Sequence, residues 1–556
     1  RNMLINYNPS WFVINPLRDI QTGIMYNLAE ESKTGGRVMG ENMTAEIIAG
    51  YLPAGKAYIQ NTRGKSSGNP ELDAFYEEYQ SAGAATGLTL TRDIDEQKRR
   101  LASMISDGSV KSGVRSLGKL IEDLNASSEN VIRFATFVAA RRNKVTLEKA
   151  ASLAKNLTVN FTRKGELSSG VNLMYLFFNA AVQGTANIAQ ALSGRSTSGG
   201  LTKAQVAVAS LTLISYLVTE HNLMASEEDD DGKSVYDDLS DYDKLMSWNI
   251  VNADGKTFTQ IPLPYGYGFF HTLGRLGAEY ANESIDFGDV LATTTAGFAH
   301  HMLPPPLGFV GAIGKSDDTM DFVSRAAVDL APDIVEPVLA LAVNKNYFGS
   351  PIYLESNPLM TPAPDSSKSK RSTEKMYKDI AQFANRESGG SLYRTGGVDF
   401  SPDAMKYWVE YFSGGLGRFV SRSMDASYKL SNEVPADDLA AGEYPILRYF
   451  NADPNHYNDQ MEYYENIKDA QQIFLENKEI SGPEKVLFAK RNAPVIKLET
   501  QYKSVQKELR ALRKQKKLIE KNQTDPVRAY ELITQIEEKM QLLFDQFNKN
   551  YRAATK

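Results

Sequence analysis

The chain has 556 residues, a net charge of −6 and no cysteine. That length is too great for one compact core, and it predicts roughly two to four subdomains. The net charge excludes a global attraction to nucleic acid or to anionic lipid, so such contacts would have to come from local patches. The lack of cysteine excludes disulfides, thiolate metal sites and a cysteine nucleophile, and it suits a protein that meets both reducing and oxidising compartments.

The chain opens on Arg1 instead of Met, and its first apolar stretch lacks both a basic region and a small-residue cleavage site. We therefore expect no signal peptide at this position. The opening suggests a piece of a longer polypeptide, or alternatively a sequence shortened for expression.

Residues 1–160 are expected to form an N-terminal helical region. A segment broken by Pro9 and Pro16 leads into a helical pattern that starts near Ile20. The Gly-, Asn-, Ser- and Tyr-rich composition near 50–90 predicts an exposed loop or arm with a short helix at 71–80. Further helices are expected over 92–125, 129–143 and 147–154.

Residues 161–365 are expected to form a central helical region. Two apolar runs, 171–192 and 204–218, flank a Gly- and Ser-rich break and predict an apolar helical hairpin over 171–218. The acidic tract 227–243 predicts a loop. Asp254-Gly255 lies between two short β-prone runs, which predicts a two-stranded β-hairpin near 248–262. The basic, Ser-rich segment 366–371 predicts a linker.

Two further regions complete the chain, a helical region at 372–456 and long charged helices at 457–556. Helical patterns over 500–521 and 525–551 flank a short polar break, and Pro526 suits the first position of the second helix. We therefore expect an antiparallel helical hairpin at the C-terminus. The expected fold class is mainly α, as a helical assembly of several subdomains.

The candidate motifs for catalysis or metal binding lack the residue spacing that such sites require. Gly64-Lys65-Ser66 and Gly314-Lys315-Ser316 lack the earlier glycine of a phosphate loop. The five histidines have no metal-ligand spacing, and adjacent His300 and His301 are expected to point to different sides of a helix. The acidic tract departs from a calcium loop because Glu227 and Asp238 stand at the end positions. We expect no catalytic residue, no cofactor and no metal site, with any catalytic module outside this chain.

The apolar hairpin leaves two interpretations open. Its first helix carries amides four residues apart on one face and aromatic residues in its first half; these are Asn179, Gln183, Asn187, Phe177 and Phe178. They could form core helices whose amides make subunit contacts or line a lumen. Alternatively, the segment could insert into a membrane or lie against it. The second run has about fifteen residues, fewer than the roughly twenty needed to span a bilayer.

The helix expected over 500–521 is rich in cations. The residues that we expect to contact DNA or a neighbouring subunit are Lys507, Arg510, Arg513, Lys514 and Lys517. A plain solvated surface is the third alternative.

An ordered series of segments resembles one protein family. The segments are Asn8–Asp19, Asn160–Glu166, Phe177–Gly184, Asp254–Gly266, Asn346–Ile352 and Ser401–Gly417. Together they are similar to the large polyvalent protein-associated domains of bacteriophage virion and ejection proteins. The resemblance covers about residues 6–423 and does not clearly include the final helical hairpin.

This resemblance implies a protein of the virion that is ejected with the DNA, and it supplies no catalytic residue. We expect a homo-oligomeric part of a conduit that carries phage double-stranded DNA across the host periplasm and cell envelope. The expected partners are other ejection proteins, portal or tail components and the host inner membrane. The alternative is a non-catalytic accessory domain of a giant virion enzyme, either an RNA polymerase or a peptidoglycan-degrading enzyme, whose active site lies upstream.

Overall fold

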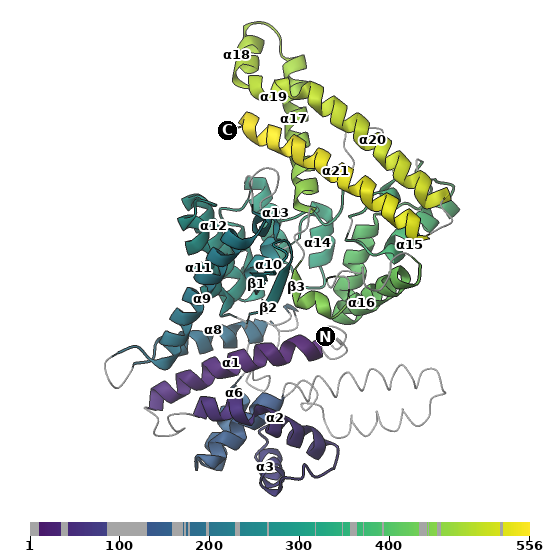
Figure 1. Cartoon of the computed structure of the whole chain (residues 1–556). Coiled ribbons are helices and arrows are strands. Elements are labelled where there is room, and N and C mark those ends of the chain that lie inside the picture. Colours follow the sequence, from purple (N-terminus) through teal and green to yellow (C-terminus); the bar gives the residue numbers. More distant parts are fainter. Residues whose placement is uncertain are drawn as a thin grey trace.

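The computed structural model describes residues 11–34, 43–85, 130–157, 171, 174–175, 178–195, 200–227, 234–263, 266–316, 319–346, 349–355, 364–370, 372–391, 394–432, 442, 444–452, 457–522 and 526–555. Helices dominate these ranges, and their one sheet has three short antiparallel strands. The mainly α fold class is therefore confirmed. Figure 1 shows the helices in successive groups, with the C-terminal hairpin at the opposite end of the molecule from α2 and α3.

Helix α1 spans Trp11–Thr34 and contains Pro16. The prediction that proline breaks this segment ahead of a helix near Ile20 is wrong. Pro16 removes one backbone hydrogen bond, but tertiary packing holds the helix on both sides. Its residues pack on the N-terminal core through Ile20 and on the central helices through Met25. In Figure 1, α1 lies between these two groups.

The first core lies in the N-terminal region. It is built by α2 (Met43–Thr62), α3 (Pro70–Ser81), helical residues 130–142 and α6 (Leu147–Asn156). The short helix expected at 71–80 and those expected at 129–143 and 147–154 are confirmed within the described residues. The exposed loop or arm near 50–90 is wrong for residues 50–62, because Ala54, Ala57 and Tyr58 are buried. The helix expected over 92–125 lies outside the described residues.

Small residues explain why the composition of α2 resembles that of an exposed loop. A Cβ added at Gly55 would lie 3.0 Å from Val131 Cγ1, so glycine permits close approach of two helices. Aromatic rings then fill the core, where Tyr79 contacts Phe134 and Phe137 edge-on with centroids 5.4 Å apart in both pairs. The same small and aromatic residues that resemble a loop in sequence thus form a packed interior.

The apolar runs form α8 (Phe178–Leu192) and α9 (Lys203–Ala225). Helix α8 begins at Phe178, and Val171 and Met174 before it are also helical, while residues 172–173 and 176–177 lie outside the described residues. Thr202 and Gln205 form a reciprocal capping box at the start of α9. Gln205 Nε2 also donates to the carbonyl oxygens of Leu192 (2.7 Å) and Gly194 (3.1 Å), which ties the two helices together. However, α9 packs more extensively on α11 than on α8.

The predicted β-hairpin is confirmed. Strands β1 (Ser247–Val251) and β2 (Phe258–Pro262) pair antiparallel, with Trp248 opposite Ile261. Asp254 Oδ1 accepts from the backbone nitrogens of Lys256 and Thr257 at 2.9 Å, which fixes the turn. A third strand, β3 (Asn451–Ala452), pairs with β2. It comes from far along the chain, and no local pattern predicted it.

The acidic tract, expected as a loop, is helical over part of its described residues. The short helices η1 (Val235–Asp238) and α10 (Asp241–Met246) follow Ser234 and Ser240, whose hydroxyls accept hydrogen bonds from the first-turn amides. Burial of Tyr236 and Leu239 anchors this part, which explains why a charged tract is folded.

The central helices follow the sheet. They are α11 (Gly268–Ala281), α12 (Phe287–Met302), η2 (Pro305–Ala312), α13 (Thr319–Leu330) and α14 (Glu336–Val343). Figure 1 shows α9, α11 and α12 side by side on one flank of the molecule. The contacts of α9 with α11 and of α11 with α12 hold this layer together.

The next group comprises η3 (Asp365–Ser367), α15 (Lys375–Glu387) and α16 (Pro402–Asn432). The segment 366–371 was expected as a linker, but its described residues are fixed to the start of α16. Asp399 accepts from the backbone nitrogen of Ser366 (2.9 Å), and Asp403 accepts from that of Lys370 (3.1 Å). Helix α16 bends at Gly414, where φ is 60° and ψ is −143°.

The C-terminal group follows η5 (Leu447–Tyr449) and comprises α17 (Tyr457–Glu479), α18 (Pro483–Arg491), α19 (Ala493–Lys497), α20 (Glu499–Asn522) and α21 (Pro526–Thr555). The expected helical hairpin is confirmed as α20 and α21, and Pro526 occupies the first helical position. Helix α17 packs on the hairpin through Tyr463, Ile467 and Phe474, forming a second core.

Candidate interaction surfaces

The amides predicted on the first apolar helix lie on α8. Asn179, Gln183 and Asn187 are half-buried, while Ala181 and Ile188 face the interior. Asn179 and Gln183 both interact with other groups of the chain. Phe178 is half-buried, and Phe177 lies outside the described residues. These amides therefore stand at the margin of the packed helices, and their contact with a subunit, lumen or membrane remains a prediction.

Helix α9 has an inverted distribution of polar and apolar side chains. Its buried residues include Ser215, Thr219 and Asn222. Its exposed residues include Leu213 and Leu217, at 58% and 56% exposure. A surface helix normally turns its apolar stripe inward. The helix therefore presents leucines to its surroundings.

The buried polar face of α9 holds the β-hairpin. Ser215 Oγ accepts from Trp248 Nε1 at 2.7 Å. The Asn222 amide donates to the carbonyl oxygen of Asn249 (2.6 Å) and accepts from the backbone nitrogen of Val251 (2.9 Å). These hydrogen bonds replace those that the buried polar groups would otherwise make with water. Polar burial on one face thus forces the apolar side chains to the other face.

Exposed apolar residues are also present on α11 and α12. Tyr280 of α11 and Phe287 of α12 are both exposed, and their ring centroids are 6.5 Å apart. Leu291 lies one helical turn further along α12 and is also exposed. Clusters of exposed apolar residues are typical of sites that contact another protein or lipid. Within the described ranges, no helix is both long enough and apolar enough to cross a bilayer.

Three histidines surround the end of α10. The Nε2 atoms of His271 and His301 lie 2.9 and 3.2 Å from the carbonyl oxygens of Lys244 and Leu245. His300 Nε2 lies 3.0 Å from Met246 Sδ. The rings of His300 and His301 are 5.0 Å apart, so the expectation that they point to different sides is wrong. The side chains of adjacent residues diverge by about 100° around the helix axis, and this angle still lets two bulky rings meet.

Burial keeps these imidazoles neutral. It lowers the pKa of His271 and of His301 to about 3, and that of His300 to about 4. Nearby Arg275, which is buried with Glu279 at 2.7 Å, adds to the shift at His271. Among the described residues, no group of three His, Asp or Glu side chains is arranged to hold a metal ion. The histidines hold α10 in place.

The cations predicted on the C-terminal hairpin lie on α20. Lys507, Arg510 and Lys514 are exposed. Arg513 is half-buried and donates from Nη2 to the hydroxyl of Tyr464 on α17. The side chain of Lys517 lies outside the described part of α20. The structure thus divides the predicted set, since Arg513 takes part in internal packing while three other cations face outward.

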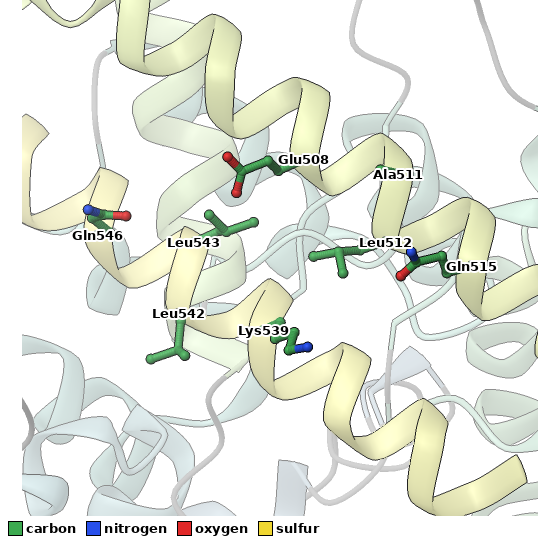
Figure 2. A pocket seen from close by; sticks show the side chains of 8 residues that line it. All are labelled: Glu508, Ala511, Leu512, Gln515, Lys539, Leu542, Leu543 and Gln546. Carbon is green, nitrogen blue, oxygen red and sulfur yellow. The ribbon is translucent and has the colours of Figure 1, made fainter.

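A groove runs between α20 and α21 beside these cations. Its volume is about 360 Å³, and its lining residues are Glu508, Ala511, Leu512, Gln515, Lys539, Leu542, Leu543 and Gln546. Figure 2 shows Leu512 and Leu543 pointing toward one another from the two helices, with Glu508 and Gln546 toward one end and Gln515 and Lys539 toward the other. Sequence reasoning identified the basic helix but missed this groove.

A third apolar surface lies on α16. Phe419, Val420, Met424 and Tyr428 line a shallow hollow of about 500 Å³ along one face of this helix. Upstream on the same helix, Trp408 and Phe412 are stacked with centroids 5.1 Å apart and are both exposed. The spacing of four residues in these positions is a sequence signal that could have identified the face.

Residues 233–447 match the family model described as large polyvalent protein associated domain 38. This region is similar to a large polyvalent protein associated domain. The domain begins in the acidic tract, includes the sheet strands β1 and β2 and the helices α11 to α16, and ends at η5. No curated protein and no solved structure is significantly similar to the chain.

The match divides the segments on which the resemblance rested. The large polyvalent protein associated domain contains those at Asp254–Gly266, Asn346–Ile352 and Ser401–Gly417. Those nearer the N-terminus, including Phe177–Gly184 on α8, lie outside it. The C-terminal hairpin also lies outside the domain, as expected. Helix α9 precedes the domain in sequence and packs on its helix α11.

Proposed function

We propose that this chain is part of a bacteriophage ejection protein that assembles with copies of itself into a conduit for the genome. In this proposal it is carried in the virion and acts in the periplasm and envelope of the host. Double-stranded DNA would pass through the assembly, and other ejection proteins, portal or tail components and the inner membrane would be its neighbours. The chain has no catalytic role in this proposal.

The inverted helix α9 carries the proposal. Leu213 and Leu217 are exposed, while Ser215 and Asn222 are buried in contacts with the β-hairpin. Exposing apolar surface to water costs roughly 25 cal/mol per Å², so a helix that displays leucines beside further apolar residues on α11 and α12 gains by being covered. A neighbouring copy of the chain is the cover that a conduit requires.

The large polyvalent protein associated domain supports the phage setting through the resemblance described above. The description of the matched domain also favours the second candidate, a non-catalytic accessory domain of a larger virion enzyme. The two candidates differ in what covers α9. A conduit covers it with further copies, whereas an accessory domain covers it with an upstream part of the same polypeptide.

The test is the assembly state of the purified chain with its virion partners and lipid, measured by light scattering and electron microscopy. We expect a closed ring or tube with α8 and α9 at subunit contacts or along the channel. Replacing Leu213 and Leu217 together by serine should abolish the assembly and leave the helical circular dichroism unchanged, because both side chains are already exposed.

The matched control is Leu487→Ser on α18, which is 70% exposed and lies away from α9. This variant should assemble like the original chain. A chain that stays monomeric with partners and lipid would favour the accessory-domain function. Assembly that survives the double replacement would show that α9 does not form the subunit contact.

A further inference from the structure

The hairpin of α20 and α21 has an apolar seam between its helices on each of two faces, and another helix already covers one of these seams. On the filled seam, α17 packs through Tyr463, Ile467 and Phe474. The hairpin contributes Val505 and Leu509 from α20 and Phe544, Phe547 and Tyr551 from α21 to this core. A helix is therefore the partner that this hairpin accepts on one face.

The open seam is the groove between the helices. Its residues on α20 are Glu508, Ala511, Leu512 and Gln515, and those on α21 are Lys539, Leu542, Leu543 and Gln546. Both sets follow the spacing i, i+3, i+4, i+7, which places each set along one face of its helix. This is the arrangement in which two helices present a groove to a third. Leu542 is 58% exposed there.

Charge indicates what kind of helix would fit. Helix α20 carries eight Lys or Arg residues against three Glu, whereas the cations and anions of α21 are equal in number. Lys507 and Lys514 are exposed and, at about 100° per residue, lie on the flank of the α20 face that lines the groove. An occupant with acidic residues beside its apolar stripe would complement this flank.

The filled seam shows that an acidic helix is accepted beside the hairpin, although its contacts are mainly apolar and Lys478 of α17 pairs with Glu499 of α20 at 2.9 Å. Helix α17 carries six Asp or Glu residues against two Lys. The hairpin thus already packs against a helix with excess acidic residues, through the apolar face of that helix. DNA fits the open seam less well, because a phosphate backbone has no complement for Leu512, Leu542 and Leu543. A second basic hairpin would fit less well too, because it would bring like charges together.

We propose that the groove between α20 and α21 binds an acidic amphipathic helix of a partner protein. Leucines of the groove would take the apolar stripe of that helix, and Lys507 and Lys514 would face its acidic flank. This site shares no residue with the α9 surface, so its test is separate from the test of the conduit function.

The test uses a fluorescent peptide with the sequence of residues 457–479, added to the full chain and followed by fluorescence anisotropy. We expect saturable binding of one peptide per chain. Leu542→Asn should weaken binding about tenfold or more, because it places an amide in the groove. The double variant Lys507→Glu, Lys514→Glu should also weaken it about tenfold. A peptide whose six acidic residues are changed to amides should bind more weakly than the original.

The controls are Leu487→Asn and Lys485→Glu on α18, which change exposed residues outside the groove and should leave binding unchanged. Because Leu542 is itself exposed, its replacement should leave the fold intact, which circular dichroism checks. Unchanged peptide binding by Leu542→Asn would overturn the proposal.

Two other results would overturn it in favour of a different occupant. A 20-base-pair DNA duplex that displaces the peptide, and whose binding depends on the two lysines but not on Leu542, would assign the surface to DNA. Dimerisation of the full chain that is lost in Leu542→Asn would assign the groove to a second copy.

Discussion

Asn222 illustrates how one buried side chain decides the placement of two elements. Strand β1 is an edge of the sheet, and an edge leaves backbone groups unpaired. The Asn222 amide pairs with two of them, the carbonyl oxygen of Asn249 and the backbone nitrogen of Val251. An amide both donates and accepts, so it can replace a neighbouring strand at this point. The polar face of α9 therefore packs against the sheet, and its leucines lie on the exposed face of the helix.

Glycines of α11 allow α9 to come close enough for these bonds. A Cβ added at Gly274 would lie 2.1 Å from the backbone oxygen of Thr212, whereas one added at Gly277 would lie 3.5 Å from Tyr216 Cδ2. The first distance is a clash with backbone, and the second is an ordinary contact. These two glycines of one helix therefore give a matched pair of substitutions.

We predict that Gly274→Ala lowers the free energy of unfolding by about 2–4 kcal/mol, since the two helices must separate. Gly277→Ala should be neutral or raise it by up to about 1 kcal/mol, because alanine favours helix over glycine. Urea unfolding followed by circular dichroism measures both. Equal effects of the two substitutions would contradict the close approach of α9 and α11.

At the scale of elements, short α10 depends on neighbours for its position. Six residues are too few to be helical alone. Carbonyl oxygens at its end accept from imidazoles of α11 and α12. The Nδ1 atom of His271 is buried without a hydrogen-bond partner, so protonation there would leave a charge without compensation beside Arg275. This contact between elements is therefore sensitive to acid.

We predict a pH-dependent stability to which His271 contributes. Burial lowers its folded-state pKa to about 3, whereas the unfolded value is about 6.5. Its contribution is fully present above pH 6.5 and is lost as the pH falls toward 3, because the unfolded chain binds the proton first. Between pH 7 and pH 4.5 the loss from His271 is roughly 2–3 kcal/mol.

His271→Gln keeps a donor for Lys244 and removes this titration, so the variant should lose roughly 2–3 kcal/mol less than the original chain over the same interval. Unfolding by urea at both pH values gives the comparison. The difference between the two proteins is needed because other groups also titrate. Burial lowers the pKa values of His300 and His301, which change stability in the same direction, and raises that of Asp329 to about 7, which changes it in the opposite direction. Parallel pH profiles would contradict a neutral, buried His271.

At the scale of the whole molecule, two cores lie at opposite ends and share no residue. The N-terminal core spans Met43 to Leu157, and the C-terminal core spans Tyr463 to Tyr551. Figure 1 shows the central helices between them. Separate cores open independently when few contacts connect them. This arrangement is consistent with the several subdomains expected from chain length. The boundaries of these subdomains stay a prediction.

We predict that core substitutions act locally. Leu509→Ala should lower protection from hydrogen exchange in α17, α20 and α21 by about 2–5 kcal/mol and leave residues 43–62 and 130–157 unchanged. Phe137→Ala should have the converse effect. Mass spectrometry of exchanged peptides measures both in one experiment. Loss of protection throughout the chain from either substitution would show one cooperative unit instead.

The sequence by itself determined the features that depend on neighbouring residues. Helical periodicity predicted α6, α20 and α21, Asp254-Gly255 predicted the β-hairpin, and Pro526 marked the start of the last helix. The ordered motifs pointed to the family that residues 233–447 match. These signals are local, because a cap, a turn or a helical face involves residues within a few positions of one another.

Only the tertiary structure decided which faces are covered. Packing on two sides carries α1 through Pro16, and contact with residues 130–142 buries α2, although its composition resembles a loop. The bonds of Asn222 to β1 turn the leucines of α9 outward, and the third strand and the groove of α20 and α21 join residues distant in sequence. Burial depends on which partner arrives from elsewhere in the chain, and no local pattern contains that partner.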